Sequence, residues 1–143
     1  AEIHPIDFSK PNLVDAAIAE VIDPTVVTTL TAGGPVAAGS IVRTPRRGTK
    51  VRKFGRTSGY SIGEILDVNA ILETTYETPH GTRKALFTNQ IVCTKCSDEG
   101  DSGSLITTLT GRPVGLLFAG SEAITVANRI SDVLSALDID ILR

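Results

Sequence analysis

The sequence predicts an all-β domain that closes with a helix. From Gly48 onward, apolar segments alternate with turns at a spacing of ~10 residues, which is typical of a small antiparallel barrel or sandwich. Thirteen glycines, together with Thr and Val spread along the chain, favour the same class. The 143 residues suffice for one ordinary domain, and an apolar content of 41% is that of a globular chain rather than a disordered one.

The predicted strands fill most of the chain beyond Gly48. Turn residues separate them, and the two clearest hairpin turns are Arg56-Thr57-Ser58-Gly59 and Thr78-Pro79-His80-Gly81. A helix is expected at 131–142, because an apolar stripe runs through it and Ser131 is a good N-cap. The expected strands are 49–55, 60–68 or longer, 69–76, 84–94, 104–108, 113–119 and 123–129.

The first 47 residues are less regular. Apolar residues from Leu13 to Ile22 follow helical spacing with Asp15 as a cap, which the local pattern slightly favours. The competing interpretation is a short buried strand in which Asp15 precedes Ala-Ala-Ile-Ala. Residues 24–47 are rich in Pro, Gly, Thr and Ala and indicate a linker, with a short strand expected at 25–30. We therefore divide the chain into residues 1–30, a linker at 31–47 and a main domain at 48–143.

Basic residues gather in one stretch. Seven of the fourteen Lys and Arg lie between Arg43 and Arg56, and no acidic residue occurs from Pro24 to Gly63. Such a patch can contact phosphates or an acidic partner. However, the net charge is −2 and few aromatic residues interleave the patch, which argues against nucleic-acid binding. We favour a solvated linker and hairpin edge, where Lys and Arg deter edge pairing.

Little in the sequence indicates a metal, a cofactor or a membrane. Cys93 and Cys96 are spaced C-x-x-C, but a structural zinc site usually needs four ligands, and His4 and His80 are distant in sequence. We expect ordinary thiols or one local disulfide, no metal and no cofactor. No apolar run approaches the ~20 residues that span a bilayer, so no membrane contact is expected. The cellular compartment stays open.

The run Gly100-Asp101-Ser102-Gly103-Ser104 has the composition of a nucleophile loop. A serine hydroxyl is a poor nucleophile unless a base removes its proton. A glycine-lined turn exposes that hydroxyl and lets backbone N–H groups converge where an oxyanion can form. The same composition also suits a plain hairpin loop. The surrounding sequence therefore has to decide between a nucleophile loop and a hairpin.

With its surroundings, this run resembles the G-D-S-G signature of the chymotrypsin-like serine proteases, in their bacterial trypsin-like form. Residues 115–121 resemble the strand that walls the specificity pocket, and 126–130 the strand that closes it. Residues 51–65 resemble the first hairpin of the second barrel, with its G-R-T-S-G run, and the helix from Ser131 resembles the C-terminal helix. The resemblance covers roughly residues 48–142 and implies an antiparallel Greek-key barrel, the second of that fold, with residues 1–30 as a remnant of the first.

The resemblance also implies roles for single residues. Ser102 would be the nucleophile, and the N–H groups of Gly100 and Ser102 would form the oxyanion hole. Asp15, in a segment that resembles the aspartate motif of the family, would orient the histidine; as a helix cap it would have no such role. The residues implied to bind substrate are Cys96, Phe118, Ala119 and Gly120. Cys96 would lie near the pocket floor where trypsin-like enzymes carry Asp, which suggests a small or apolar substrate side chain.

The family needs a histidine ahead of the aspartate, and this sequence has none that fits. His4 precedes Asp15 but adjoins a constraining proline, and His80 lies in a turn after Asp15. We therefore expect a C-terminal portion, with the histidine on a separate fragment or lost by proteolysis, and self-cleavage before Ala1 as one route. Apolar faces of residues 1–30 would then need cover from that N-terminal fragment or from self-association.

The sequence thus predicts a trypsin-like serine endopeptidase domain that acts on peptide or protein substrates through an acyl-enzyme. Without the histidine, the chain alone is expected to be inactive. Two alternatives stay open: a non-catalytic trypsin-like interaction module, and an anion- or nucleic-acid-binding β-barrel that uses the patch from Arg43 to Arg56.

Overall fold

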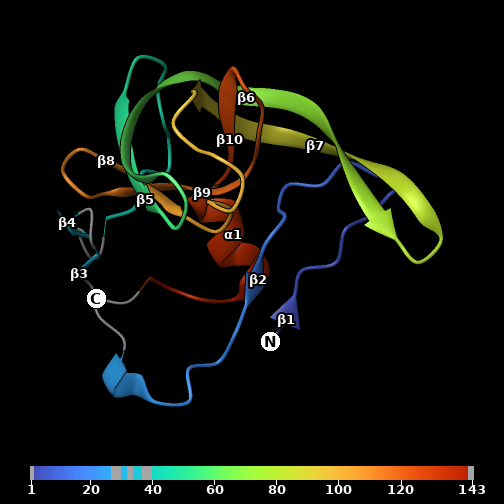
Figure 1. Ribbon diagram of the computed structural model, residues 1–143, viewed down its shortest axis with the longest axis horizontal. Coiled ribbons are helices and arrows are strands. Elements are labelled where there is room, and N and C mark those ends of the chain that lie inside the picture. Colours follow the sequence, from blue (N-terminus) through green and yellow to red (C-terminus); the bar gives the residue numbers. More distant parts are fainter. Residues whose placement is uncertain (1, 27–29, 32–33, 37–39, 142–143) are drawn as a thin grey trace.

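A closed barrel of antiparallel strands forms the body of the protein (Figure 1). The computed structural model describes residues 2–26, 30–31, 34–36 and 40–141. The barrel strands are β5 (Lys50–Gly55), β6 (Gly59–Thr78), β7 (Gly81–Thr94), β8 (Leu105–Thr108), β9 (Pro113–Gly120) and β10 (Ile124–Arg129). The all-β prediction is confirmed, and the expected strands match these bounds to within a few residues except at β6.

The order of the strands around the barrel is that of a Greek key. β5, β6 and β7 are neighbours in sequence order, and β8 returns to lie beside β5, which gives the spatial order β8-β5-β6-β7. β9 and β10 then close the barrel between β8 and β7. Branched aliphatic side chains fill its interior, as a chain without Met or Trp requires. This core consists of Val51, Ile65, Ile91, Cys93, Ile106, Val114, Leu117 and Ala127.

β6 is one long strand where the sequence suggested a break between 60–68 and 69–76. Its pairing with β7 shifts register three times between Ile65 and Leu72. Asp67 accepts a hydrogen bond from the Asn69 N–H within that stretch. The polar residues therefore produce bulges, which bend a strand without ending it. Beyond the bulges, β6 and β7 continue as a two-stranded hairpin that projects from the barrel (Figure 1).

The C-terminal helix α1 (Ile130–Leu137) follows β10 directly and is shorter than expected. Arg129, not Ser131, is the N-cap residue, and no side chain caps the helix. The helix ends because Asp138 adopts a left-handed conformation with φ of 51°. Val133 forms a buried cluster with Val14 and Ala16 of the N-terminal segment, and Leu137 packs against this cluster. In the described part of the chain, no helix is long or apolar enough to cross a membrane.

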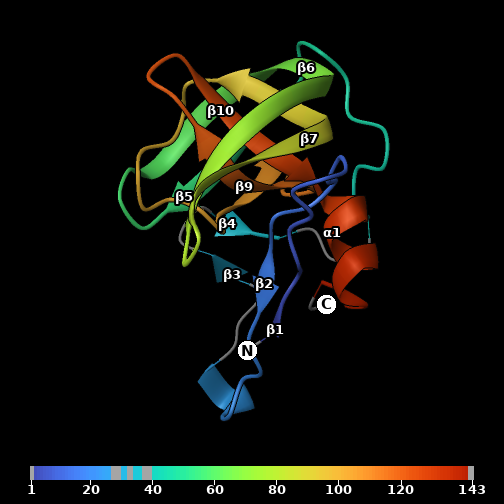
Figure 2. The same ribbon diagram turned by 90° about the vertical axis from the view of Figure 1, so that its right-hand side faces the viewer.

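The N-terminal segment is extended, so the favoured helix at 13–22 is wrong. The alternative of a short strand is correct at Ala17 and Ile18, but these two residues are not buried as that interpretation expected. β1 (Glu2–Ile3) pairs with β2 (Ala17–Ile18) in a small sheet below the barrel (Figure 2). Between them, Asn12 bridges Phe87 of β7 in parallel. Side-chain amides of the barrel also bind the backbone of this segment at Leu13 and Asp15. These long-range bonds outweigh a local helical preference that is weak in itself.

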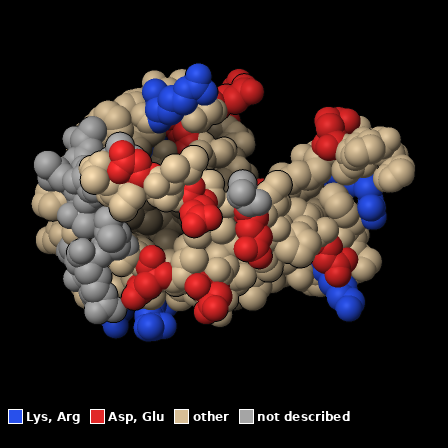
Figure 3. Space-filling view, turned by 90° about the horizontal axis from the view of Figure 1, so that it is seen from below, with Lys and Arg blue, Asp and Glu red and all other residues tan. Residues whose placement is uncertain are grey.

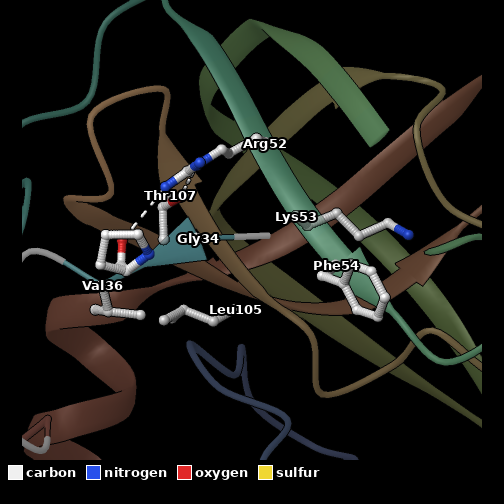
Figure 4. Close-up of a pocket in the computed structure, with 8 residues that line it drawn as sticks. Gly34, Val36, Arg52, Lys53, Phe54, Leu105 and Thr107 are labelled. Atoms are coloured by element: carbon white, nitrogen blue, oxygen red, sulfur yellow. Dashed lines mark hydrogen bonds between the residues drawn. The ribbon is translucent and has the colours of Figure 1, made fainter. Parts of the chain in front are cut away.

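The linker contains two very short strands. β3 (Leu30–Thr31) pairs with β4 (Gly34–Pro35), and a 3-10 turn, η1 (Pro24–Val26), precedes them. The strand expected at 25–30 falls largely on residues 27–29, which lie outside the described residues, as do parts of the linker at 32–33 and 37–39. Arg52 of β5 donates hydrogen bonds to Thr107 and to the Pro35 carbonyl, which ties the linker to the barrel (Figure 4).

Candidate active site

Ser102 is exposed in the loop that joins β7 to β8. Two hydrogen bonds attach this loop to β9: the Gly103 N–H donates to the Leu117 carbonyl at 2.8 Å, and the Leu117 N–H donates to the Ser104 carbonyl at 3.0 Å. The Ser102 hydroxyl lies 3.5 Å from the Phe118 carbonyl oxygen, a long and weak contact. The serine side chain is therefore held close to β9 while its oxygen stays open to solvent.

Among the described residues, two of the N–H groups from Gly100 to Ser104 are without an acceptor. The N–H groups of Asp101, Gly103 and Ser104 donate to backbone carbonyls. Within the described residues, those of Gly100 and Ser102 have no such partner. Gly100 has a φ of +95°, a left-handed conformation that favours glycine. The two open donors flank Asp101 and lie in the loop that presents the Ser102 hydroxyl.

A fully buried ion pair anchors this loop. Lys53 Nζ of β5 lies 2.7 Å from Asp101 Oδ2, and both side chains are 0% exposed. The lysine also donates to the Ser58 hydroxyl. Burial by itself raises the pKa of Asp101, but the hydrogen bonds from Lys53, Ser58 and Asp98 outweigh it and hold that pKa well below its ordinary value. Asp101 is therefore ionised at neutral pH.

The turn between β5 and β6 is wrapped around the same carboxylate. The N–H groups of Thr57 and Ser58 donate to Asp101 Oδ1 at 2.8 and 3.1 Å, and the Ser58 hydroxyl donates to Oδ2 at 2.5 Å. A Cβ on Gly55 would overlap the Asp101 carboxylate, so only glycine fits there. The G-R-T-S-G run of the sequence therefore has a physical function here: it cradles the aspartate next to Ser102.

Lys53 is the residue that sequence reasoning missed. Its place in the basic stretch predicts a solvated side chain, which is wrong, because the side chain is fully buried. Figure 4 shows Arg52 and Lys53 pointing to opposite sides of β5. The alternation along this strand contained the signal, since Val51, Lys53 and Gly55 share its buried face. Arg43, Arg46, Arg47, Lys50 and Arg56 are exposed, as the interpretation of a solvated stretch expected.

Asp15 lies half-buried just before β2, in the segment that crosses the barrel. Its Oδ2 accepts a hydrogen bond from the Tyr76 hydroxyl at 2.6 Å. Its N–H donates to Asn128 Oδ1 at 3.0 Å. Asn128 is fully buried on β10 and is itself bound to Gln90 of β7 at 2.8 Å. The position of Asp15 therefore depends on Tyr76 of β6 and on the Asn128–Gln90 pair that joins β10 to β7, and Asp15 caps no helix.

A hollow of about 480 Å³ adjoins Ser102. Of the residues implied to bind substrate, Ala119 and Gly120 line it, whereas Phe118 and Cys96 do not. Apolar Leu117 also lines it, and the rest of the lining is mostly polar: Lys95, Ser97, Asp98, Glu99, Gly100, Ser121 and Glu122. Because Cys96 does not line this hollow, its identity gives no reason to expect a small or apolar substrate side chain there.

Both cysteines are free and buried. Cys96 packs against β6, where a Cβ on Gly63 would come within 2.9 Å of its sulfur. Burial, together with the neighbouring Cys96, raises the pKa of Cys93 to about 12. No group of His, Cys, Asp and Glu in the described ranges could hold a metal ion.

Among the described residues, no hydrogen bond joins either histidine to Ser102 or Asp15, although the His4 N–H donates to the carbonyl of Ala16, beside Asp15, at 3.0 Å. His80 is exposed in the turn at the far end of the β6–β7 hairpin, and His4 lies next to β1. Among the described residues, the hydrogen-bond partners of Ser102 and Asp15 are Phe118, Tyr76 and Asn128. A proton acceptor for Ser102 is thus missing from the site formed by these residues.

Solved structures reveal the relationship of this fold. Protease A from Thermobifida fusca superposes with a TM-score of 0.61 and 26% sequence identity, covering 82% of this chain and 62% of that one. The chymotrypsin of Cellulomonas bogoriensis gives a TM-score of 0.58 and 24% identity over 78% of this chain and 58% of that one. The chain has the fold of the bacterial chymotrypsin-like serine proteases. The Nocardiopsis protease agrees, with a TM-score of 0.58 and 21% identity over 82% of this chain and 60% of that one.

This chain spans about three fifths of the length of these solved proteases, between 58 and 62%. No protein-family model and no curated protein matches its sequence. The predicted resemblance is therefore confirmed by three-dimensional structure.

Proposed function

We propose that this chain is the nucleophile-bearing part of a serine endopeptidase. The observation that carries the proposal is the β7–β8 loop. It presents an exposed serine hydroxyl next to two unpaired N–H groups and is held rigid by a buried ion pair. Rigid donors aimed at a developing oxyanion are the largest single contribution in acyl-transfer catalysis. In this assignment Ser102 is the nucleophile, and Gly100 and Ser102 donate the N–H groups of the oxyanion hole.

The reaction proceeds in two balanced steps. Ser102 Oγ attacks the carbonyl carbon of a peptide bond while its proton passes to a histidine, and the same proton then leaves with the amine as the C–N bond breaks. Water, deprotonated by the same histidine, then cleaves the acyl ester and restores the serine. Asp15 orients the imidazole through its carboxylate, and a peptide segment lies along the end of β9 at Ala119 and Gly120.

The histidine comes from outside these 143 residues, either from a separate fragment or from another part of a longer polypeptide. Support comes from the lack of a suitable base within the described residues and from the exposed apolar side chains of the N-terminal segment. Ile3, Val21 and Ile22 are 73%, 50% and 100% exposed, and Leu13 is 48% exposed. Such side chains mark a surface that another polypeptide covers. Without that partner, we expect the chain to be inactive.

The test is active-site labelling with a fluorophosphonate. The protein is isolated from its native source through a tag on this chain, and the modified residue is located by peptide mass spectrometry. We expect a covalent adduct on Ser102, none in Ser102→Ala, and an unchanged yield in Ser40→Ala, which alters an exposed serine that does not line the hollow. If the native assembly gives no adduct, and Ser102→Ala abolishes no peptide cleavage, the endopeptidase assignment is wrong.

Charge gives little support to the alternative of a nucleic-acid-binding barrel. Lys53 is buried, and Lys50 is paired with Glu64 at 2.7 Å. Arg52 is bonded to Thr107 and Pro35. Across the face that carries the N-terminal segment and α1, acidic side chains are scattered and basic ones lie near its margins (Figure 3). A non-catalytic interaction module remains the outcome that a failed labelling experiment would favour.

A further inference from the structure

Among the described residues, the carboxylate of Asp15 is bound through only one of its oxygens. The Tyr76 hydroxyl donates to Oδ2 at 2.6 Å, and the backbone of Asp15 is fixed separately by its N–H bond to Asn128 at 3.0 Å. Within the described residues, Oδ1 receives no hydrogen bond. An ionised carboxylate offers about four lone-pair positions on its two oxygens. The arrangement therefore leaves one oxygen available to a further donor.

Aromatic packing holds the tyrosine in place. Phe8 meets the Tyr76 ring edge-on, with centroids 6.1 Å apart, and Phe87 lies on its other side at 6.4 Å. Phe87 is 0% exposed, so the packing that supports the ring belongs to the core of the molecule. Burial first, and then the bond to Asp15, raises the pKa of Tyr76 above its ordinary value. The tyrosine is therefore a permanent neutral donor and cannot serve as the base for Ser102.

The same aromatic cluster extends to the nucleophile. The rings of Phe87 and Phe118 are 5.0 Å apart, and the Phe118 carbonyl is the group that the Ser102 hydroxyl approaches. Asp15 and Ser102 therefore lie at the two ends of one packed cluster formed by Tyr76, Phe87 and Phe118. Tyr76 enters this cluster from the β6–β7 hairpin, which is part of the barrel that carries Ser102.

We propose that Tyr76 is a positioning residue of the protease, whose hydroxyl fixes Oδ2 of Asp15 so that Oδ1 is directed at the histidine that activates Ser102. This inference rests on the proposed function. The hairpin thereby allows the nucleophile-bearing barrel to set the orientation of an aspartate that lies on a different segment of the chain. The hydroxyl acts through Asp15 and touches neither the substrate nor the reacting atoms.

The test compares Tyr76→Phe with Tyr60→Phe, the only other tyrosine of the chain, which is half exposed and makes no comparable bond. Phenylalanine keeps the ring and its packing and removes only the hydroxyl. A hydrogen bond to a charged group corresponds to a ten- to hundred-fold effect. In the native assembly we therefore expect Tyr76→Phe to lower the rate of Ser102 labelling, and kcat for peptide cleavage, about ten-fold or more. KM should stay unchanged, and Tyr60→Phe should match the wild type.

The outcomes separate the two proposals. If the wild type is labelled at Ser102 and Tyr76→Phe is labelled equally fast, the positioning role is refuted while the endopeptidase assignment stands. If Tyr76→Phe lowers kcat, raises KM and also lowers the melting temperature, Tyr76 has a merely structural role, and the inference is refuted as well. If the wild type is not labelled at all, the proposed function fails, and the positioning role fails with it.

Discussion

Replacement of Lys53 by methionine would leave the Asp101 carboxylate buried without its counter-ion. The two side chains are 0% exposed and 2.7 Å apart. Removal of one partner from a buried ion pair costs about 3–5 kcal/mol, because the remaining charge stays desolvated. Asp101 keeps its bonds from Thr57, Ser58 and Asp98, so we expect a loss near the lower end, about 3 kcal/mol. That is a large fraction of the ~5–15 kcal/mol that stabilises a typical domain.

Lys50 provides a matched control on the same strand. Its pair with Glu64 has the same 2.7 Å separation, but the side chains are 59% and 37% exposed. Solvent and salt screen such a pair, so Lys50→Met should cost only about 0–1 kcal/mol. Urea unfolding at neutral pH, followed by circular dichroism, measures both losses. Double-mutant cycles with Asp101→Asn and Glu64→Gln give the coupling energies. Equal losses, or equal couplings, would refute the argument that burial makes the Lys53 pair strong.

The same pair makes an acid-side prediction. The pKa of Asp101 in the folded protein lies below its unfolded value of about 3.9. Its stabilisation is therefore fully present above about pH 4 and is lost as the pH falls further, towards the lowered folded pKa. We expect the free energy of unfolding of the wild type to decline below that pH. The difference in the free energy of unfolding between wild type and Lys53→Met should narrow over the same range. A constant difference down to pH 2 would contradict this linkage.

Three further changes test other parts of the site. Gly100→Ala places a Cβ 2.5 Å from the Thr57 hydroxyl at a φ of +95°, whereas the Cβ of Gly103→Ala meets open space at a φ of +86°. Backbone strain of about 1–3 kcal/mol is common to both variants, so urea unfolding should show the larger loss of stability for Gly100→Ala. Equal losses of stability would exclude the clash with Thr57. Asn128→Leu leaves the Asp15 N–H unpaired, which should lower the free energy of unfolding by about 1–3 kcal/mol and speed hydrogen exchange of that amide in NMR spectra. Unchanged exchange would show that the bond to Asn128 does not protect the Asp15 amide. Cys93, with its pKa raised to about 12, should resist Ellman's reagent at pH 8 until the protein unfolds. Its contribution to the free energy of unfolding should be fully present below about pH 8.5 and decline as the pH rises towards 12. Rapid reaction of Cys93 in the folded protein would contradict its burial.

The barrel strands could be located from sequence because their signals are local. Apolar runs, glycine-containing turns and β-branched residues mark each strand from Lys50 onward, and the structure moves their ends by only a few residues. The exception is informative. Asp67 and Asn69 have turn-like side chains, and the sequence alone cannot tell a turn from a bulge, because that depends on whether β7 continues alongside.

The N-terminal segment shows where local pattern fails. Leu13, Val14, Ala17 and Ile18 have helical spacing, yet the segment is extended and lies across the barrel. Its backbone bonds to Asn128 and Gln90 come from residues more than 70 positions away. A window of ten residues contains no information about such partners, so the two interpretations could not be separated before the tertiary structure was known.

By itself, the sequence determined the fold class, the loop at Ser102 and the candidate aspartate, since each depends on residue types at short spacing. Tertiary structure alone decided how the loop is anchored and how Asp15 is held. Lys53 meets Asp101 across 48 positions of sequence, and Tyr76 meets Asp15 across 61. Both pairs form because closing the barrel and laying the N-terminal segment across it bring distant chemical groups together. Burial then strengthens those contacts by excluding the water that would otherwise compete for them.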